Sequence, residues 1–226
     1  MTRDQFLLSG VGIAANAAIR PSSVAATTTM KPRMTGLEVL RELRAGYHRY
    51  KAGKSEHGDY TEQRAATAEA QHPFAIVLTC SDSRVPPEIL FDQGIGDLFV
   101  IRVAGNIADA AGIGSIEYAV ANYACPLVLV LGHTNCGAVK AAVDSLEHHE
   151  AAPGEIETIV QKILPAARAA RHEEGDVYLN ATKANAAGVA ADLRKVEPII
   201  AAAVREKRLT VASAVYSVKT GSVRVL

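Results

Sequence analysis

The chain has 226 residues, of which 49% are hydrophobic and 21% are charged, with 24 basic and 24 acidic residues. This length and composition exclude disordered and fibrous proteins and predict a globular protein with one core. The balanced charge leaves no excess of Lys and Arg for binding nucleic acid, and no apolar run reaches 18 residues, so we expect neither a nucleic-acid partner nor a membrane span.

Residues 1–35 differ in composition from the rest of the chain and are expected to lie outside the fold. Arg3 precedes an apolar stretch of small residues at 6–19, and a stretch rich in Ser, Thr and Ala follows it. The pattern resembles an export signal, although Asp4 stands in the region that should be basic. Two interpretations therefore stay open, a periplasmic protein with a working signal and a cytoplasmic protein with a disordered extension.

Residues 36–69 carry a helical pattern and no strand pattern. Leu37, Leu40, Leu43 and Tyr47 recur at spacings of three and four, which places them on one face of a helix. A polar, Ala-rich stretch follows. We predict a helical arm that packs outside a central sheet.

After the arm, apolar runs of strand length alternate with helical patterns. The runs are continuous rather than alternating, which indicates strands covered on both faces, as in a parallel sheet. They cover residues 74–79, 98–101, 127–131 and 209–218. A turn at 219–222 then predicts an antiparallel edge strand over 223–226. The predicted fold class is α/β, with about five mostly parallel strands flanked by helices.

Three helical patterns separate these strands. Apolar residues repeat at helical spacing within 113–123, 139–146 and 156–163, and we interpret all three segments as crossover helices. No linker or internal repeat interrupts the pattern. Residues 36–226 are therefore predicted to form a single domain.

Two of the predicted strands lead into residues with metal-binding side chains. Cys80 follows the first strand, and His133 and Cys136 follow the third. Because ligands of open α/β sheets bind outside the carboxyl ends of the strands, we expect these side chains to meet. Two thiolates and an imidazole are donors that zinc prefers, and three protein ligands leave a fourth position open for water, as in catalytic zinc sites.

Asp82 and Arg84 alternate with Cys80 and would point to the same side of an extended backbone. A bidentate ion pair would hold Asp82 ionised beside the open metal position. The third cysteine, Cys125, lies in an apolar stretch and is interpreted as a buried core residue.

The motif Cys-Ser-Asp-Ser-Arg at residues 80–84, followed by His-x-x-Cys-Gly at 133–137, resembles the β-class carbonic anhydrases, and the similarity extends from about residue 71 to the C-terminus. The resemblance implies reversible hydration of carbon dioxide to bicarbonate and a proton. It implies one zinc ion per subunit on Cys80, His133 and Cys136, with Asp82 and Arg84 orienting the zinc-bound water.

The same resemblance implies a substrate pocket that is partly shared across a dimer interface. Its residues would be Gln71, Phe99, Ala104, Tyr118 and Gly137. The helical arm would embrace the partner subunit, which predicts a dimer or a higher even oligomer.

Three alternatives remain at this stage. Cys80 or Cys136 could act as a nucleophile with His133 as base, as in thiol hydrolases. Asp82 could close the zinc as a fourth ligand in a binding module without turnover. The same zinc site could instead hydrolyse carbon disulfide or carbonyl sulfide.

Overall fold

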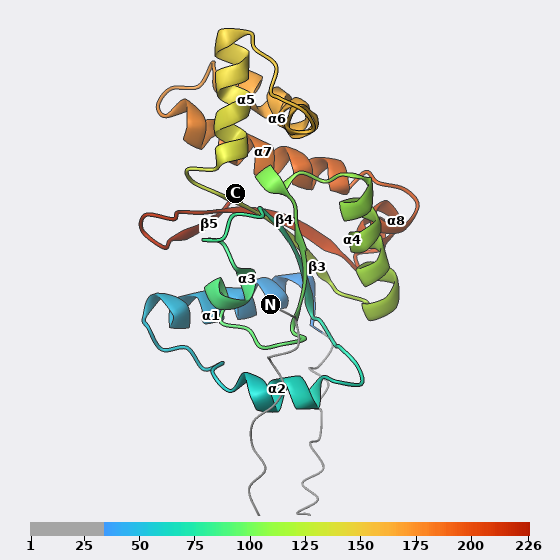
Figure 1. The fold of residues 1–226 in the computed structure, drawn as a ribbon. Coiled ribbons are helices and arrows are strands. Elements are labelled where there is room, and N and C mark those ends of the chain that lie inside the picture. The colour runs from blue at the N-terminus through green and yellow to red at the C-terminus, as the bar shows by residue number, and fades with distance from the viewer. Residues whose placement is uncertain (1–33) are drawn as a thin grey trace, which may run out of the picture.

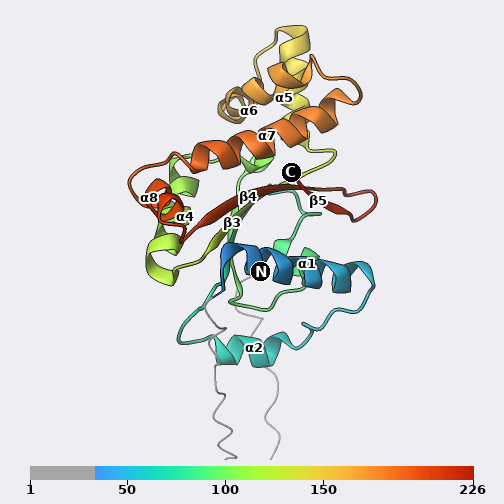
Figure 2. The same ribbon diagram turned by 180° about the vertical axis from the view of Figure 1, so that it is seen from behind.

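The computed structural model describes residues 34–226, so the signal-like segment and its two interpretations lie outside the described residues except for Met34 and Thr35. The described chain is built around a five-stranded sheet with the strand order β2-β1-β3-β4-β5 (Figures 1 and 2). The strands are β1 (Ala75–Thr79), β2 (Leu98–Arg102), β3 (Leu127–His133), β4 (Thr210–Tyr216) and β5 (Val223–Val225). The first four are parallel to their neighbours and β5 is antiparallel to β4, which confirms the predicted α/β sheet and its edge strand.

The central strands are buried on both faces. Every residue of β1 and β3 is buried. Ile76 and Leu78 contribute to one core, whereas Ala75 and Val77 contribute to the core on the opposite face. This two-sided burial is the physical reason that these strands read as continuous apolar runs.

Helices cover each face of the sheet (Figures 1 and 2). One face carries α4 (Ala110–Tyr123), α7 (Val177–Leu193) and α8 (Ile199–Arg205). The other carries α1 (Gly36–Lys51) and the short α3 (Pro87–Leu90). The predicted arm is thus present as α1 and α2 (Tyr60–Ala66), and Val39 and Leu43 of α1 are buried against the sheet.

A buried carboxylate ties the arm to the segment after α3. Asp92 is 1% exposed and accepts hydrogen bonds from the side chains of Arg49 and Ser55 and from the backbone N–H of Glu56. Burial alone would raise the pKa of this carboxyl, but the bonds from Ser55 and Arg49 outweigh it and hold the pKa well below its usual range. The arm is therefore held to the rest of the domain by an ion pair and hydrogen bonds as well as by apolar packing.

The prediction of three separate crossover helices is wrong for the connection from β3 to β4, which contains several helices. Between β2 and β3 the one α-helix is α4, while α5 (Gly137–His148) and α6 (Ile156–Ala170) share one long connection with α7 and α8. The helix α7 was missed because its consecutive residues 180–182 are all buried, so it shows no single apolar stripe. It packs against the sheet and against α5 and α6, which form a lobe beyond the carboxyl edge of the strands (Figure 1).

Among the described residues, no helix is both long enough and apolar enough to cross a membrane.

Candidate metal centre

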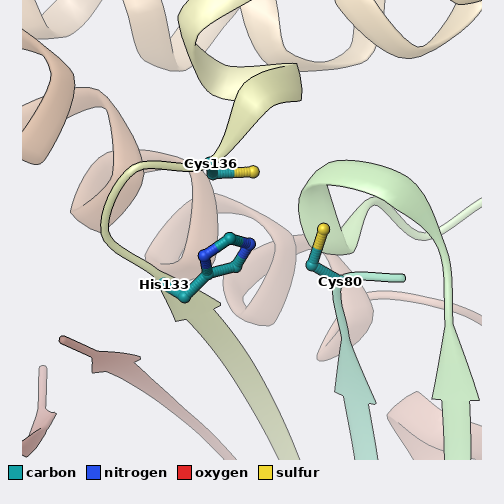
Figure 3. A group of neighbouring side chains, drawn as sticks. All are labelled: Cys80, His133 and Cys136. Atoms are coloured by element: carbon teal, nitrogen blue, oxygen red, sulfur yellow. The ribbon is translucent and has the colours of Figure 1, made fainter. Parts of the chain in front are cut away.

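The carboxyl ends of β1 and β3 and the start of α5 bring three metal-binding side chains together (Figure 3). Cys80 directly follows β1, His133 is the last residue of β3, and Cys136 is the N-cap of α5. All three side chains are buried, and their ligand atoms lie within 4.8 Å of one another. The structure therefore assembles the Cys-His-Cys group that the sequence predicts.

A tight turn between His133 and Cys136 makes this convergence possible. Asn135 has a φ of 55°, in the left-handed region that Asn tolerates better than most residues. The chain then enters α5, where the backbone N–H groups of Val139 and Ala138 favour the charged form of the Cys136 sulfur. The sulfur thus sits at the positive end of the helix dipole.

His133 is oriented with one ring nitrogen toward the two sulfurs. Its side chain is 0% exposed, and Nδ1 donates to the carbonyl oxygen of Thr134 at 3.0 Å. The other nitrogen, Nε2, is buried and has no hydrogen-bond partner within the part of the chain that the structure describes. An unprotonated Nε2 without a partner is costly to bury unless it binds a cation, so the histidine fits a metal ligand.

A hydrogen bond between the side chains of Cys80 and Cys136 shifts the pKa values of the two thiols in opposite directions. A hydrogen bond from Cys136 lowers the pKa of Cys80 far below its usual value, although burial opposes the shift, and His133 adds to it. The same bond, together with burial, raises the pKa of Cys136. A soft divalent cation between the sulfurs would replace the proton of that hydrogen bond and satisfy both thiolates, which makes this donor set suitable for zinc.

The predicted ion pair lies beside the ligands. Arg84 donates from Nε to Oδ1 of Asp82 at 2.9 Å and from Nη2 to Oδ2 at 2.7 Å, and this pairing holds the pKa of Asp82 well below its usual range. Oδ2 of Asp82 lies 3.9 Å from Nε2 of His133. An ionised carboxylate with unused lone pairs therefore borders the space that the ligands face.

Arg102 is a contributor that the sequence analysis missed. Its Nε donates to the carbonyl oxygen of Cys80 at 3.1 Å and its Nη2 to that of Asp82 at 2.5 Å. These bonds, which come from the neighbouring strand β2, fix the backbone of the Cys-Ser-Asp-Ser-Arg motif at residues 80–84. Arg102 directly follows the predicted strand 98–101 and is the last residue of the observed β2, and its position in sequence alone gave no signal of this role.

Only two of the five predicted pocket residues lie near the ligands. Ala104 begins the short helix η1 (Ala104–Asn106), whose Gly105 contacts Cys80, and Gly137 directly follows Cys136 with open space where a Cβ would stand.

The remaining three pocket residues lie at the amino edge of the sheet. Phe99 pairs with Ile76, four residues before Cys80, which corresponds to about 13 Å along the strand. The rings of Phe99 and Tyr118 are 6.3 Å apart, and Gln71 Nε2 donates to the Tyr123 hydroxyl at 3.0 Å. Within one chain, the structure does not bring Gln71, Phe99 and Tyr118 to the metal ligands.

Cys125 takes no part in this centre. It is 2% exposed, and its thiol donates to the carbonyl oxygen of Pro73 at 3.1 Å. Burial raises the pKa of this thiol to about 12, so it remains protonated.

Comparisons with known proteins give consistent matches. A family model described as carbonic anhydrase matches residues 75–223. The chain is 45% identical over 136 residues to a carbonic anhydrase of Mycolicibacterium smegmatis, a match that covers 60% of this chain and 66% of that protein, just under two thirds of its length. It is 39% identical over 143 residues to carbonic anhydrase 2 of Mycobacterium tuberculosis, covering 63% of this chain and 69% of the relative.

Solved structures show the same fold. A β-carbonic anhydrase of Coccomyxa in complex with acetazolamide superposes with a TM-score of 0.63 at 25% identity, over 85% of this chain and 87% of that chain. A tetrameric β-carbonic anhydrase of Sordaria macrospora superposes with a TM-score of 0.64 at 23% identity, over 84% and 96% of the two chains.

Proposed function

We propose, because the chain belongs to the β-class carbonic anhydrase family, that it catalyses the reversible hydration of carbon dioxide to bicarbonate and a proton, with one zinc ion per subunit. The observation that carries the proposal is the buried group of Cys80, His133 and Cys136, whose ligand atoms lie within 4.8 Å of one another beside Asp82, which is paired with Arg84.

Three side chains would hold the metal. The thiolates of Cys80 and Cys136 would bind it together with Nε2 of His133, because the bond from Nδ1 to Thr134 leaves Nε2 as the free lone pair. When bound, zinc supplies a Lewis acid that makes water acidic enough to provide hydroxide near neutral pH.

Asp82 would orient the attacking water. Arg84 keeps the group ionised and donates two hydrogen bonds to Oδ1 and one to Oδ2, which leaves a lone pair of Oδ2 as an acceptor. A water that donates a hydrogen bond to Asp82 turns its own lone pair away from the carboxylate and toward the carbon of the substrate.

The substrate pocket would need a second copy of the chain. Phe99 and Tyr118 present apolar rings suited to a non-polar gas, and the amide of Gln71 can donate to a substrate oxygen. Since all three lie at the far edge of the sheet, we propose that they complete the site of a partner subunit in a dimer or higher even oligomer. The tetrameric relative from Sordaria macrospora supports this proposal.

The Asp82–Arg84 pair argues against the closed-zinc alternative. Both carboxylate oxygens accept bonds from Arg84, and the backbone N–H of Arg84 adds a further bond to Oδ1 at 2.9 Å. These three bonds fix the orientation of the carboxylate, so turning it to become a fourth zinc ligand would break them.

The test compares zinc content and carbon dioxide hydration in two cysteine variants. Cys80→Ser removes a proposed ligand, and Cys125→Ser is the matched control because it changes a buried cysteine outside the centre. We expect one zinc per chain and rapid hydration in stopped-flow assays for the wild type and the control, and loss of both in Cys80→Ser.

Equal zinc contents in the two variants would contradict the ligand set. A zinc-loaded wild type without hydration activity would contradict the proposed reaction, and a fourth protein ligand seen by X-ray absorption would then favour the binding module.

A further inference from the structure

Gly105 connects the Cys80 sulfur to the helix α7. Its backbone N–H donates to Cys80 Sγ at 3.3 Å, and its carbonyl oxygen accepts a hydrogen bond from Asn185 Nδ2 at 2.8 Å. Asn185 is 3% exposed, and Cys80 is 6% exposed. A buried amide on α7 is thus only one residue removed from a proposed zinc ligand.

The conformation of Gly105 cannot be set by a side chain of its own. Its φ is 69°, in the left-handed region, and a Cβ at this position would lie 2.6 Å from Cδ1 of Ile163 and 3.1 Å from Cβ of Ala138. Glycine is therefore required, and it is the residue with the most backbone freedom. The direction of its N–H depends on the groups that hold its peptide units from outside.

Asn185 differs from the other buried polar residues of α7. Asn180 donates to the carbonyl oxygen of Glu174, and Thr182 donates to that of Tyr178, so both bonds stay near the start of α7. The bond of Asn185 instead leaves the helix and reaches the loop beside Cys80. Burying an amide costs free energy unless it is hydrogen-bonded, so this contact holds α7 and the loop in a fixed relation.

We propose that Asn185 is a positioning residue of the zinc site, which acts through Gly105 on the Cys80 sulfur. The proposal rests on the zinc ligand set of the proposed function. Asn185 fixes the Gly105 carbonyl, and the N–H of the same residue then hydrogen-bonds the thiolate and withdraws charge from it. Without the Asn185 bond the Gly105 N–H is no longer held toward the sulfur, so the preformed ligand geometry loosens and metal binding weakens.

The experiment compares Asn185→Ser with Asn180→Ser. Both changes shorten a buried Asn on the same helix, but only the first reaches the metal loop. The readouts are thermal stability, zinc affinity by competition with a chromophoric chelator, and the thiolate-to-metal absorption bands of the cobalt(II)-substituted protein. We expect both variants to lose stability, while only Asn185→Ser binds zinc about 10- to 100-fold more weakly and shifts the cobalt bands.

Asn185→Leu is the second variant. It keeps about the size of Asn, has no hydrogen-bond donor and introduces no buried charge, so it tests the hydrogen bond where the serine variant does not fold. We expect the same weakening of metal binding and the same shift.

Folded Asn185 variants with the zinc affinity and cobalt spectrum of Asn180→Ser would overturn the proposal. This comparison needs no turnover. A wild type that binds zinc without hydrating carbon dioxide would count against the proposed function alone.

Discussion

Replacing Gly105 by Ala should destabilise the protein through two separable effects. A non-glycine residue at a φ of 69° costs about 1–2 kcal/mol in backbone strain. The new Cβ would also stand 2.6 Å from Cδ1 of Ile163, a fully buried side chain, and crowding of this kind costs about 1–3 kcal/mol. Together these give about 2–5 kcal/mol, or a fall in Tm of about 4–20 °C for a chain of this length.

A double-mutant cycle with Ile163→Val separates the two effects. Val lacks the Cδ1 atom, so the second change should relieve the crowding but leave the backbone strain. Urea denaturation of the wild type, both single variants and the double variant, at one protein concentration and with excess zinc, measures the coupling. We expect the double variant to be about 1–3 kcal/mol more stable than the sum of the single effects. Additivity within about 0.5 kcal/mol, or a cost of Gly105→Ala below about 1 kcal/mol, would refute the reasoning.

Three further predictions concern the arm, the catalytic pair and pH. Gly46→Ala should lower the free energy of unfolding by about 3 kcal/mol or more, because a Cβ there would lie 1.7 Å from the Phe91 carbonyl oxygen. Gly114→Ala should raise it by about 0.5–1 kcal/mol, because a Cβ there would have nothing within 4 Å. The Tm values of the two variants should therefore move in opposite directions from that of the wild type. Asp82→Asn should keep its zinc but slow hydration by about 100-fold or more, and unchanged turnover would remove Asp82 from the mechanism. The folded-state pKa of Asp92 is depressed, so its contribution to stability is present above the unfolded pKa of about 3.9 and is lost as pH falls through the folded value. Asp92→Asn should therefore flatten the acid side of the stability profile, and an unchanged slope below pH 4 would contradict this.

The sequence predicts the sheet and the convergence of Cys80, His133 and Cys136 well, because both depend on local pattern. Continuous apolar runs mark strands that are buried on two sides, and Cys80 and His133 stand where two such runs end. The structure extends β3 as far as His133, beyond the predicted end of that strand. This extension fixes the ring of the histidine at the sheet edge.

Contacts set by tertiary packing could not be predicted in the same way. Asn185 and Arg102 reach the first motif from elements whose placement depends on the whole fold. An Ala-rich helix such as α7, buried on several sides, shows no amphipathic stripe from which its position could be read. Similarly, the sequence cannot show that Phe99 lies at the edge of the sheet opposite Cys80, because that separation follows from strand register.

The spacing of Cys80 and Cys136 along the chain would give a bound metal a second role, in the stability of the fold. β2, α4 and β3 all lie between these cysteines, so one ion held by both sulfurs would close a long covalent-like loop around them. A cross-link that closes a loop of this order lowers the entropy of the unfolded chain by the equivalent of about 3–5 kcal/mol, as a disulfide does. A disulfide forms and breaks by redox chemistry, whereas this cross-link would depend on the free metal concentration. Metal supply would then set the lifetime of the folded protein as well as its activity.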